Sequence, residues 1–172
     1  MQKGNVLLGA GSLVLVAAAG IAYATSLSGA DRQFLTAAAK ADMTEANEGQ
    51  MAENQAARAD IKDFGKTMVQ DHTDNYSRLA ALAAQDGVSI PTGIDTAKDR
   101  TIRQLVHLKG ASFDRVFTAD EIAAHREALA IFKREAEHGQ ATDVKAFASA
   151  TIPVLEKHLQ MAEACAKAAK HS

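Results

Sequence analysis

The stretch DIKDFGKTMVQDHTDNYSRL, from Asp60 to Leu79, decides the fold that this sequence predicts. Read at a period of 3.6 residues, one face of the stretch carries apolar and small side chains together with one histidine. Such a stripe is typical of a helix that turns one face into a helical bundle. The stretch therefore predicts a helix with an imidazole on its buried face, the inward positions being Ile61, Gly65, Met68, His72, Asn75, Leu79 and Leu82.

The same design returns later in the chain. The segment DVKAF, from Asp143 to Phe147, repeats the segment DIKDF, from Asp60 to Phe64. The helix that follows it places His158 on an apolar stripe formed by Val144, Phe147, Thr151, Leu155, Ala162 and Cys165. The chain is thus predicted to use a helical hairpin twice, with a histidine turned inward each time.

Start and stop signals divide the rest of the chain into helices. Thr118 and Glu121 have the spacing of a capping box, which predicts a helix start at Thr118, and Gly139 predicts its end. Four long helices in two hairpins predict an all-α four-helix bundle. The residues do not decide whether the long link between the hairpins turns back or crosses the bundle. The expected helices are 31–58, 60–85, 118–138 and 142–170, with a short extra helix within 95–109.

Composition limits the class of protein. The chain has 172 residues, enough for one domain with a core, and a formal charge of −2 that excludes a polybasic nucleic-acid surface. Its single cysteine, Cys165, excludes an internal disulfide and a cysteine-based zinc cluster. No glycine-rich phosphate loop or nucleophile elbow is present in the sequence. Protein partners are not indicated by any of these features.

The first 30 residues differ from the remainder. Lys3 precedes an uncharged apolar run, residues 6–24, that ends in the A-x-A sequence of residues 22–24. This pattern predicts a signal peptide, and the alternative is an uncleaved membrane anchor, because the run is long enough to span a bilayer. We therefore divide the chain into a signal or anchor segment, 1–30, and a bundle, 31–172. Either interpretation places the bundle in the periplasm or cell envelope, with inner-membrane attachment only through 6–24 if uncleaved.

Two pairs of residues are expected at matched heights in the hairpins. Glu45 and His72 lie equally far from a first connection centred between residues 58 and 59. His125 and His158 lie equally far from a second connection centred between residues 141 and 142. Residues equidistant from an antiparallel turn lie side by side, and all four positions fall near mid-helix. The sequence thus predicts one core layer with three imidazoles and a carboxylate.

A buried layer of this kind favours a cation. An unpaired buried carboxylate costs several kcal/mol, whereas three imidazoles and one carboxylate suit a divalent transition metal such as zinc, copper or iron. The predicted ligands are Glu45, His72, His125 and His158, with Glu48, Asp71 and Glu121 as accessory residues. The alternative is a metal-free polar layer that fixes helix register.

Six short motifs stand out along the chain: MTEANEG (43–49), MVQDHTDN (68–75), GVSIP (87–91), GASFD (110–114), AAHREAL (123–129) and PVLEKHL (153–159). As a set they resemble the motifs of the bacterial exported family called domain of unknown function 4142. The resemblance covers about residues 31–165 and implies a ferritin-like four-helix bundle that is exported. Some members of that family carry an outer-membrane label. The resemblance implies no activity, because the role of the family is unassigned.

One departure from ferritin-type chemistry narrows the prediction. A di-iron bundle uses a Glu-x-x-His motif on each of two helices, but Val69 and Leu155 occupy the positions three residues before His72 and His158. The sequence therefore favours a single metal, with a role in sequestration, sensing or structural support. A structural or stress-related envelope protein is the alternative, and a metal-dependent oxidoreductase is favoured less. The sequence favours a non-enzymatic role without deciding it.

Overall fold

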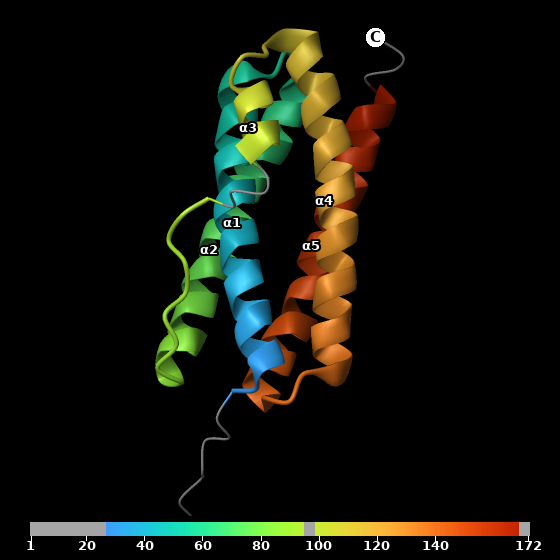
Figure 1. Ribbon diagram of the computed structural model, residues 1–172. Helices are drawn as coiled ribbons and strands as arrows, with labels where there is room; N and C mark the ends of the chain where they lie inside the picture. The colour runs from blue at the N-terminus through green and yellow to red at the C-terminus, as the bar shows by residue number, and fades with distance from the viewer. Residues whose placement is uncertain (1–26, 95–98, 169–172) are drawn as a thin grey trace, which may run out of the picture.

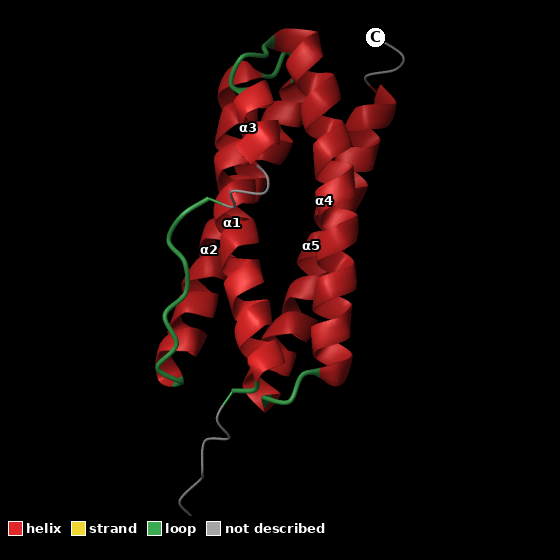
Figure 2. Cartoon of the chain, viewed as in Figure 1, coloured by secondary structure: helices red, strands yellow, loops and turns green. Residues whose placement is uncertain are grey.

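A computed structural model describes residues 27–94 and 99–168, and within these ranges the regular structure is entirely helical (Figures 1 and 2). Four long helices form the bundle, as predicted. A short fifth helix lies between the two hairpins, inside the range predicted for it. The helices are α1 (Gly29–Gln55), α2 (Ala59–Gln85), α3 (Asp99–Leu105), α4 (Gly110–His138) and α5 (Thr142–Ala168).

The connection between the hairpins crosses the length of the bundle. Figure 1 shows α2 ending at the lower end of the bundle, while α3 and the start of α4 lie at the upper end. The α1–α2 turn and the α4–α5 turn therefore lie at opposite ends. Within this arrangement α1 packs against α4 and α2 against α5, in addition to the contacts within each hairpin. Each packed pair of long helices runs antiparallel (Figure 1).

The predicted start of the third long helix was wrong. α4 begins at Gly110, so Phe113, Asp114 and Phe117 lie inside the helix and not in a connection. Thr118 does not cap the helix, because its hydroxyl donates to the carbonyl of Asp114 one turn earlier, at 2.8 Å. The apolar period that continues backward through Phe117 and Phe113 outweighs the local capping pattern, because both rings are fully buried.

The first turn begins earlier than predicted. α1 stops at Gln55 and not at Arg58. The carboxylate of Asp114 accepts a hydrogen bond from the backbone N–H of Ala57 at 3.0 Å, across the top of the bundle. A long-range contact from α4 therefore fixes this turn. The sequence of the hairpin alone does not contain that information.

The core consists of two apolar clusters with a polar layer between them. The lower cluster is built around Phe34, Phe132 and Phe147, whose rings meet edge to face or tilted. The upper cluster is built around Phe64 and Phe117, whose ring centroids lie 5.9 Å apart. The polar side chains of the bundle's mid-section lie between these clusters, away from both ends. Most of the burial that stabilises the bundle thus lies above and below the histidines.

The N-terminal segment carries the prediction of a signal peptide or membrane anchor. This segment, residues 1–30, lies almost wholly outside the described residues. Of the helices in 27–94 and 99–168, none combines the length and apolar character that crossing a membrane requires.

A pair of acids at the lower end of the bundle links α1 to α4 and to the α4–α5 turn. Asp31 completes a capping box with Ser28 at the start of α1 and accepts a hydrogen bond from the backbone N–H of Gln140, at 3.0 Å. Burial alone would raise the pKa of Asp31, but the hydrogen bonds from Gln140 and Ser28 hold it below its usual value. Burial, followed by the contact with Asp31, raises the pKa of Glu135 to about 7. Glu135 is thus protonated at mildly acidic pH and donates to Asp31.

Glu135→Gln is expected to remove a pH dependence of stability. Because the pKa of Glu135 rises from 4.5 to about 7 on folding, the folded protein binds more protons in this window, and its stability falls as pH increases from about 4.5 to 7. Glutamine keeps the donor to Asp31 without the charge. Urea unfolding at pH 5 and pH 8 should show that Glu135→Gln gains more stability relative to wild type at pH 8 than at pH 5. The exposed Glu137→Gln serves as control, and an equal difference at both pH values would contradict the assignment.

Candidate metal centre

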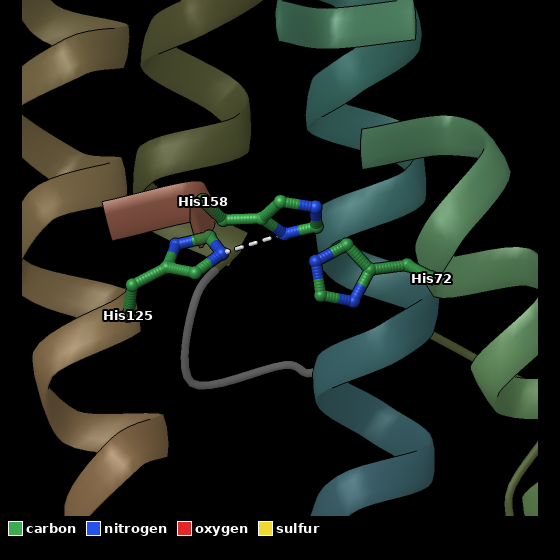
Figure 3. A group of neighbouring side chains, drawn as sticks. All are labelled: His72, His125 and His158. Atoms are coloured by element: carbon green, nitrogen blue, oxygen red, sulfur yellow. Dashed lines mark hydrogen bonds between the residues drawn. The ribbon is translucent and has the colours of Figure 1, made fainter. Parts of the chain in front are cut away.

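Three imidazole rings meet in the middle of the bundle. His72 comes from α2, His125 from α4 and His158 from α5, and all three are buried, with exposed fractions of 4%, 1% and 0%. Their ring centroids lie 5.2 to 5.8 Å apart. Figure 3 shows the three rings pointing toward one another. One ligand nitrogen from each ring lies within 4.8 Å of the other two, so the group can hold a metal ion.

Asp42 fixes the orientation of His72. The Nδ1 atom of His72 lies 2.9 Å from a carboxylate oxygen of Asp42 on α1. Asn75 donates to both oxygens of Asp42, and its own amide oxygen accepts from the hydroxyl of Thr151. Asp42 is thereby held as an acceptor, so Nδ1 of His72 carries the proton. Its Nε2 atom, buried and without a hydrogen-bond partner, presents a lone pair to the centre of the layer.

The other two rings are oriented in the same manner. Nε2 of His158 lies 2.9 Å from a carboxylate oxygen of Asp71, and Nδ1 of His125 lies 2.9 Å from the backbone carbonyl of Glu121. Both partners are acceptors, so these nitrogens carry the protons. The remaining nitrogens, Nδ1 of His158 and Nε2 of His125, therefore present lone pairs.

The lone-pair nitrogens of His125 and His158 lie 3.3 Å apart. Two lone pairs at this distance repel unless a cation or an added proton lies between them. Tetrahedral zinc with Zn–N bonds of about 2.0–2.1 Å places two ligand nitrogens about 3.3–3.4 Å apart. The observed separation therefore equals the edge of a tetrahedral site. The lone pair of His72 completes a set of three convergent nitrogens.

The electrostatics of the layer keep His158 in the neutral form that binds metals. Burial, followed by repulsion from His72, lowers the pKa of His158 to about 4, although Asp71 acts in the opposite direction. His158 is therefore neutral at pH 7. Burial also raises the pKa of Asp42, while the hydrogen bonds from His72 and Asn75 favour its ionised form. Burial thus disfavours both a charged imidazole and an ionised carboxylate in this layer. A bound cation would offset the second effect, because its positive charge would stabilise the ionised form of Asp42.

A second group of possible ligands adjoins the first. Carboxylate oxygens of Glu45 and Glu121 and a nitrogen of His125 lie within 4.8 Å of one another, and all three residues are buried. A carboxylate oxygen of Glu121 lies 3.4 Å from Nδ1 of His125. Glu48 is fully buried one turn further along α1. Carboxylate donors thus lie beside the histidines, although none of the three rings belongs to a Glu-x-x-His motif.

The structure corrects the pairing expected within the first hairpin. The acid that hydrogen-bonds Nδ1 of His72 is Asp42, at the place where Glu45 was expected. The cause is the early end of α1. The turn between Gln55 and Ala59 is centred on Ala57, and Asp42 and His72 lie equally far from Ala57 along the chain. The earlier turn shifts the partner of His72 by about one helical turn.

The accessory acids Asp71 and Glu121 contact the histidines in ways that the sequence did not predict. Asp71 points to His158 of α5 and not to its neighbour His72. Glu121 contributes its backbone carbonyl to His125 as well as a nearby carboxylate. His107 and His138 are exposed, away from the layer. The sequence did not single out Asp42, because alanine-rich α1 has several faces of similar polarity. Its spacing of about one turn from Ala38 and Glu45 was the one feature that placed it on the inward face.

One of three comparisons with known proteins identifies a family, and none of them identifies a chemistry. A family model described as a domain of unknown function (DUF4142) matches residues 16–165, most of the chain. Neither the curated proteins nor the solved structures contain a match.

Proposed function

The chain belongs to the DUF4142 family, and we propose that its bundle binds one transition-metal ion through Nε2 of His72, Nε2 of His125 and Nδ1 of His158. The convergence of three lone pairs in a buried layer, each fixed by an acceptor on the opposite ring nitrogen, carries this proposal. Imidazole donors of this kind suit zinc, copper and iron. Hydrogen bonds from the far side of metal-binding rings are typical of metal sites, because they set ring orientation and increase basicity.

Carboxylates beside the layer supply the remaining charge. Asp42 and Asp71 would act through the rings, because each accepts a ring N–H. Glu45 would provide or approach a fourth position, since it lies with Glu121 beside His125. The negative charges of these acids would balance the two positive charges of a divalent ion held inside the core.

The proposed role is sequestration, sensing or structural support of the bundle in the bacterial envelope. The envelope assignment rests on the apolar run at residues 6–24. A metal-dependent oxidoreductase is favoured less, because none of the three clustered histidines follows a glutamate by three residues, as a di-iron site requires.

The alternative is a metal-free polar layer in an envelope protein that acts through its surface. The contact between His125 and His158 favours it, because an added proton would turn this contact into a hydrogen bond. Nothing would then satisfy Nε2 of His72, which is buried without a partner. Such an orphaned acceptor costs about 1–3 kcal/mol.

Titration of the protein with Zn²⁺ and Co²⁺ tests the proposal directly. The protein is purified without a polyhistidine tag, stripped with a chelator and titrated at pH 7, with bound metal measured by elemental analysis after dialysis. We expect one equivalent to remain bound. Retention of no metal, with no change in melting temperature on addition of either ion, would favour the metal-free layer.

A further inference from the structure

We propose that the metal ion reaches the three histidines through the pocket between α1 and α4, and that Glu127 recruits it at the mouth of this pocket. The inference rests on the proposed function, because it concerns the path to the same site. The histidines are buried, so an ion must pass between helices to reach them.

The pocket provides a path of suitable size and depth. It has a volume of about 380 Å³ and is lined by residues of α1 and α4 together with His72 and Leu155. His72 and His125 both line it, so it extends to the layer of rings. Its walls include alanines from both long helices, and these short side chains leave space where larger ones would close the gap: Ala37, Ala41, Ala124 and Ala128.

Acidic side chains line the pocket from its exposed part to its buried part. Glu127 is exposed, whereas Glu45 and Asp42 are buried, with exposed fractions of 5% and 3%. Among the described residues that line the pocket there is no lysine or arginine. A cleft lined by one sign of charge raises the local concentration of the opposite ion and its rate of association. The lining therefore favours entry of a cation.

A second pocket reaches His72 from the other side, between α2 and α5, but suits a cation less well. Its volume is about 130 Å³, and Arg78 lines it along with Asp71 and Asp74. The ammonium group of Lys157 lies 3.7 Å from Asp71. Both the smaller volume and the two cations disfavour metal entry on this side.

The rate of Co²⁺ uptake by the metal-free full-length protein tests the path, followed in a stopped-flow instrument by the visible absorption of bound Co²⁺. Glu127→Gln should slow uptake by about threefold or more at low ionic strength, a part of the 10- to 1,000-fold that focused fields supply. It should also weaken the salt dependence of the rate. Ala41→Leu, which fills the pocket, should slow uptake at every ionic strength. Both variants should reach the final absorbance of wild type.

Matched variants separate the path from the site. Val154→Leu narrows the pocket between α2 and α5 and should leave the rate unchanged, as should Glu137→Gln at an exposed position away from the α1–α4 pocket. Ala37→Leu, at the exposed part of the α1–α4 pocket, repeats the blocking test if Ala41→Leu lowers the helical content. Rates unchanged by Glu127→Gln and both alanine variants, or slowed by Val154→Leu alone, would overturn the path while leaving the site intact. Failure of wild type to bind Co²⁺ at equilibrium would overturn both proposals.

Discussion

Replacing His72, His125 and His158 together with glutamine is expected to abolish metal-dependent stabilisation. A ligand at 100 times its Kd stabilises the folded protein by about 2.7 kcal/mol. For a protein of this size, that stabilisation corresponds to an increase of roughly 5–10 °C in melting temperature. Calorimetry with and without Zn²⁺ should show this increase for wild type and none for the triple variant, because all three convergent donors are lost.

Single variants and surface controls make the test specific. His158→Gln alone should lose most of the increase, since only two imidazoles remain, whereas His107→Gln and His138→Gln should keep it because both rings are exposed. If the triple variant does not fold, the single variant still decides the question. An undiminished increase in melting temperature for His158→Gln would place the metal elsewhere.

Gly49→Ala is expected to destabilise the protein, although alanine is the better helix former. A Cβ atom at Gly49 would lie 2.6 Å from the backbone carbonyl oxygen of Gly65, and the reverse holds for Gly65 against Gly49. Both obstacles are backbone atoms, so α1 and α2 must move apart. Overpacking of this kind costs about 1–3 kcal/mol and opposes the gain of about 1 kcal/mol from helix propensity. Since backbone cannot yield as a side chain does, we expect a net loss, measured by urea unfolding.

Two comparisons test the cause of this loss. Gly29 also lies in α1, but a Cβ atom there meets nothing within 4 Å, so Gly29→Ala should be neutral or stabilising. The double variant Gly49→Ala/Gly65→Ala should lose less than the sum of the single variants, because separation of the helices for the first methyl also accommodates the second. Additive losses, or a gain from Gly49→Ala, would contradict the role assigned to this contact.

The helical period predicted the bundle because it repeats over many residues. The stripe from Ile61 to Leu79 and the matching stripe around His158 survive small errors in helix boundaries, and both histidines lie on buried faces. The convergence of His72, His125 and His158 followed from their positions near mid-helix, which either topology of the link preserves. These predictions succeeded because each depends on a pattern repeated over several helical turns and not on a single residue.

The details of the centre depended on single residues and on distant contacts. Asp114 of α4 fixes the first turn through Ala57, and that turn sets which acid faces His72. A local pattern in the hairpin cannot contain this contact. The crossing of the link was undecided for the same reason, because its residues lack a period that would report which end of the bundle they reach.

The position of the bound metal tests the central proposal most directly. A crystal of the protein grown with Zn²⁺ should show one anomalous-scattering peak about 2.0–2.1 Å from Nε2 of His72, Nε2 of His125 and Nδ1 of His158. The opposite nitrogens should still contact Asp42, the carbonyl of Glu121 and Asp71. A peak bound instead through those opposite nitrogens, or no peak between the three rings, would contradict it.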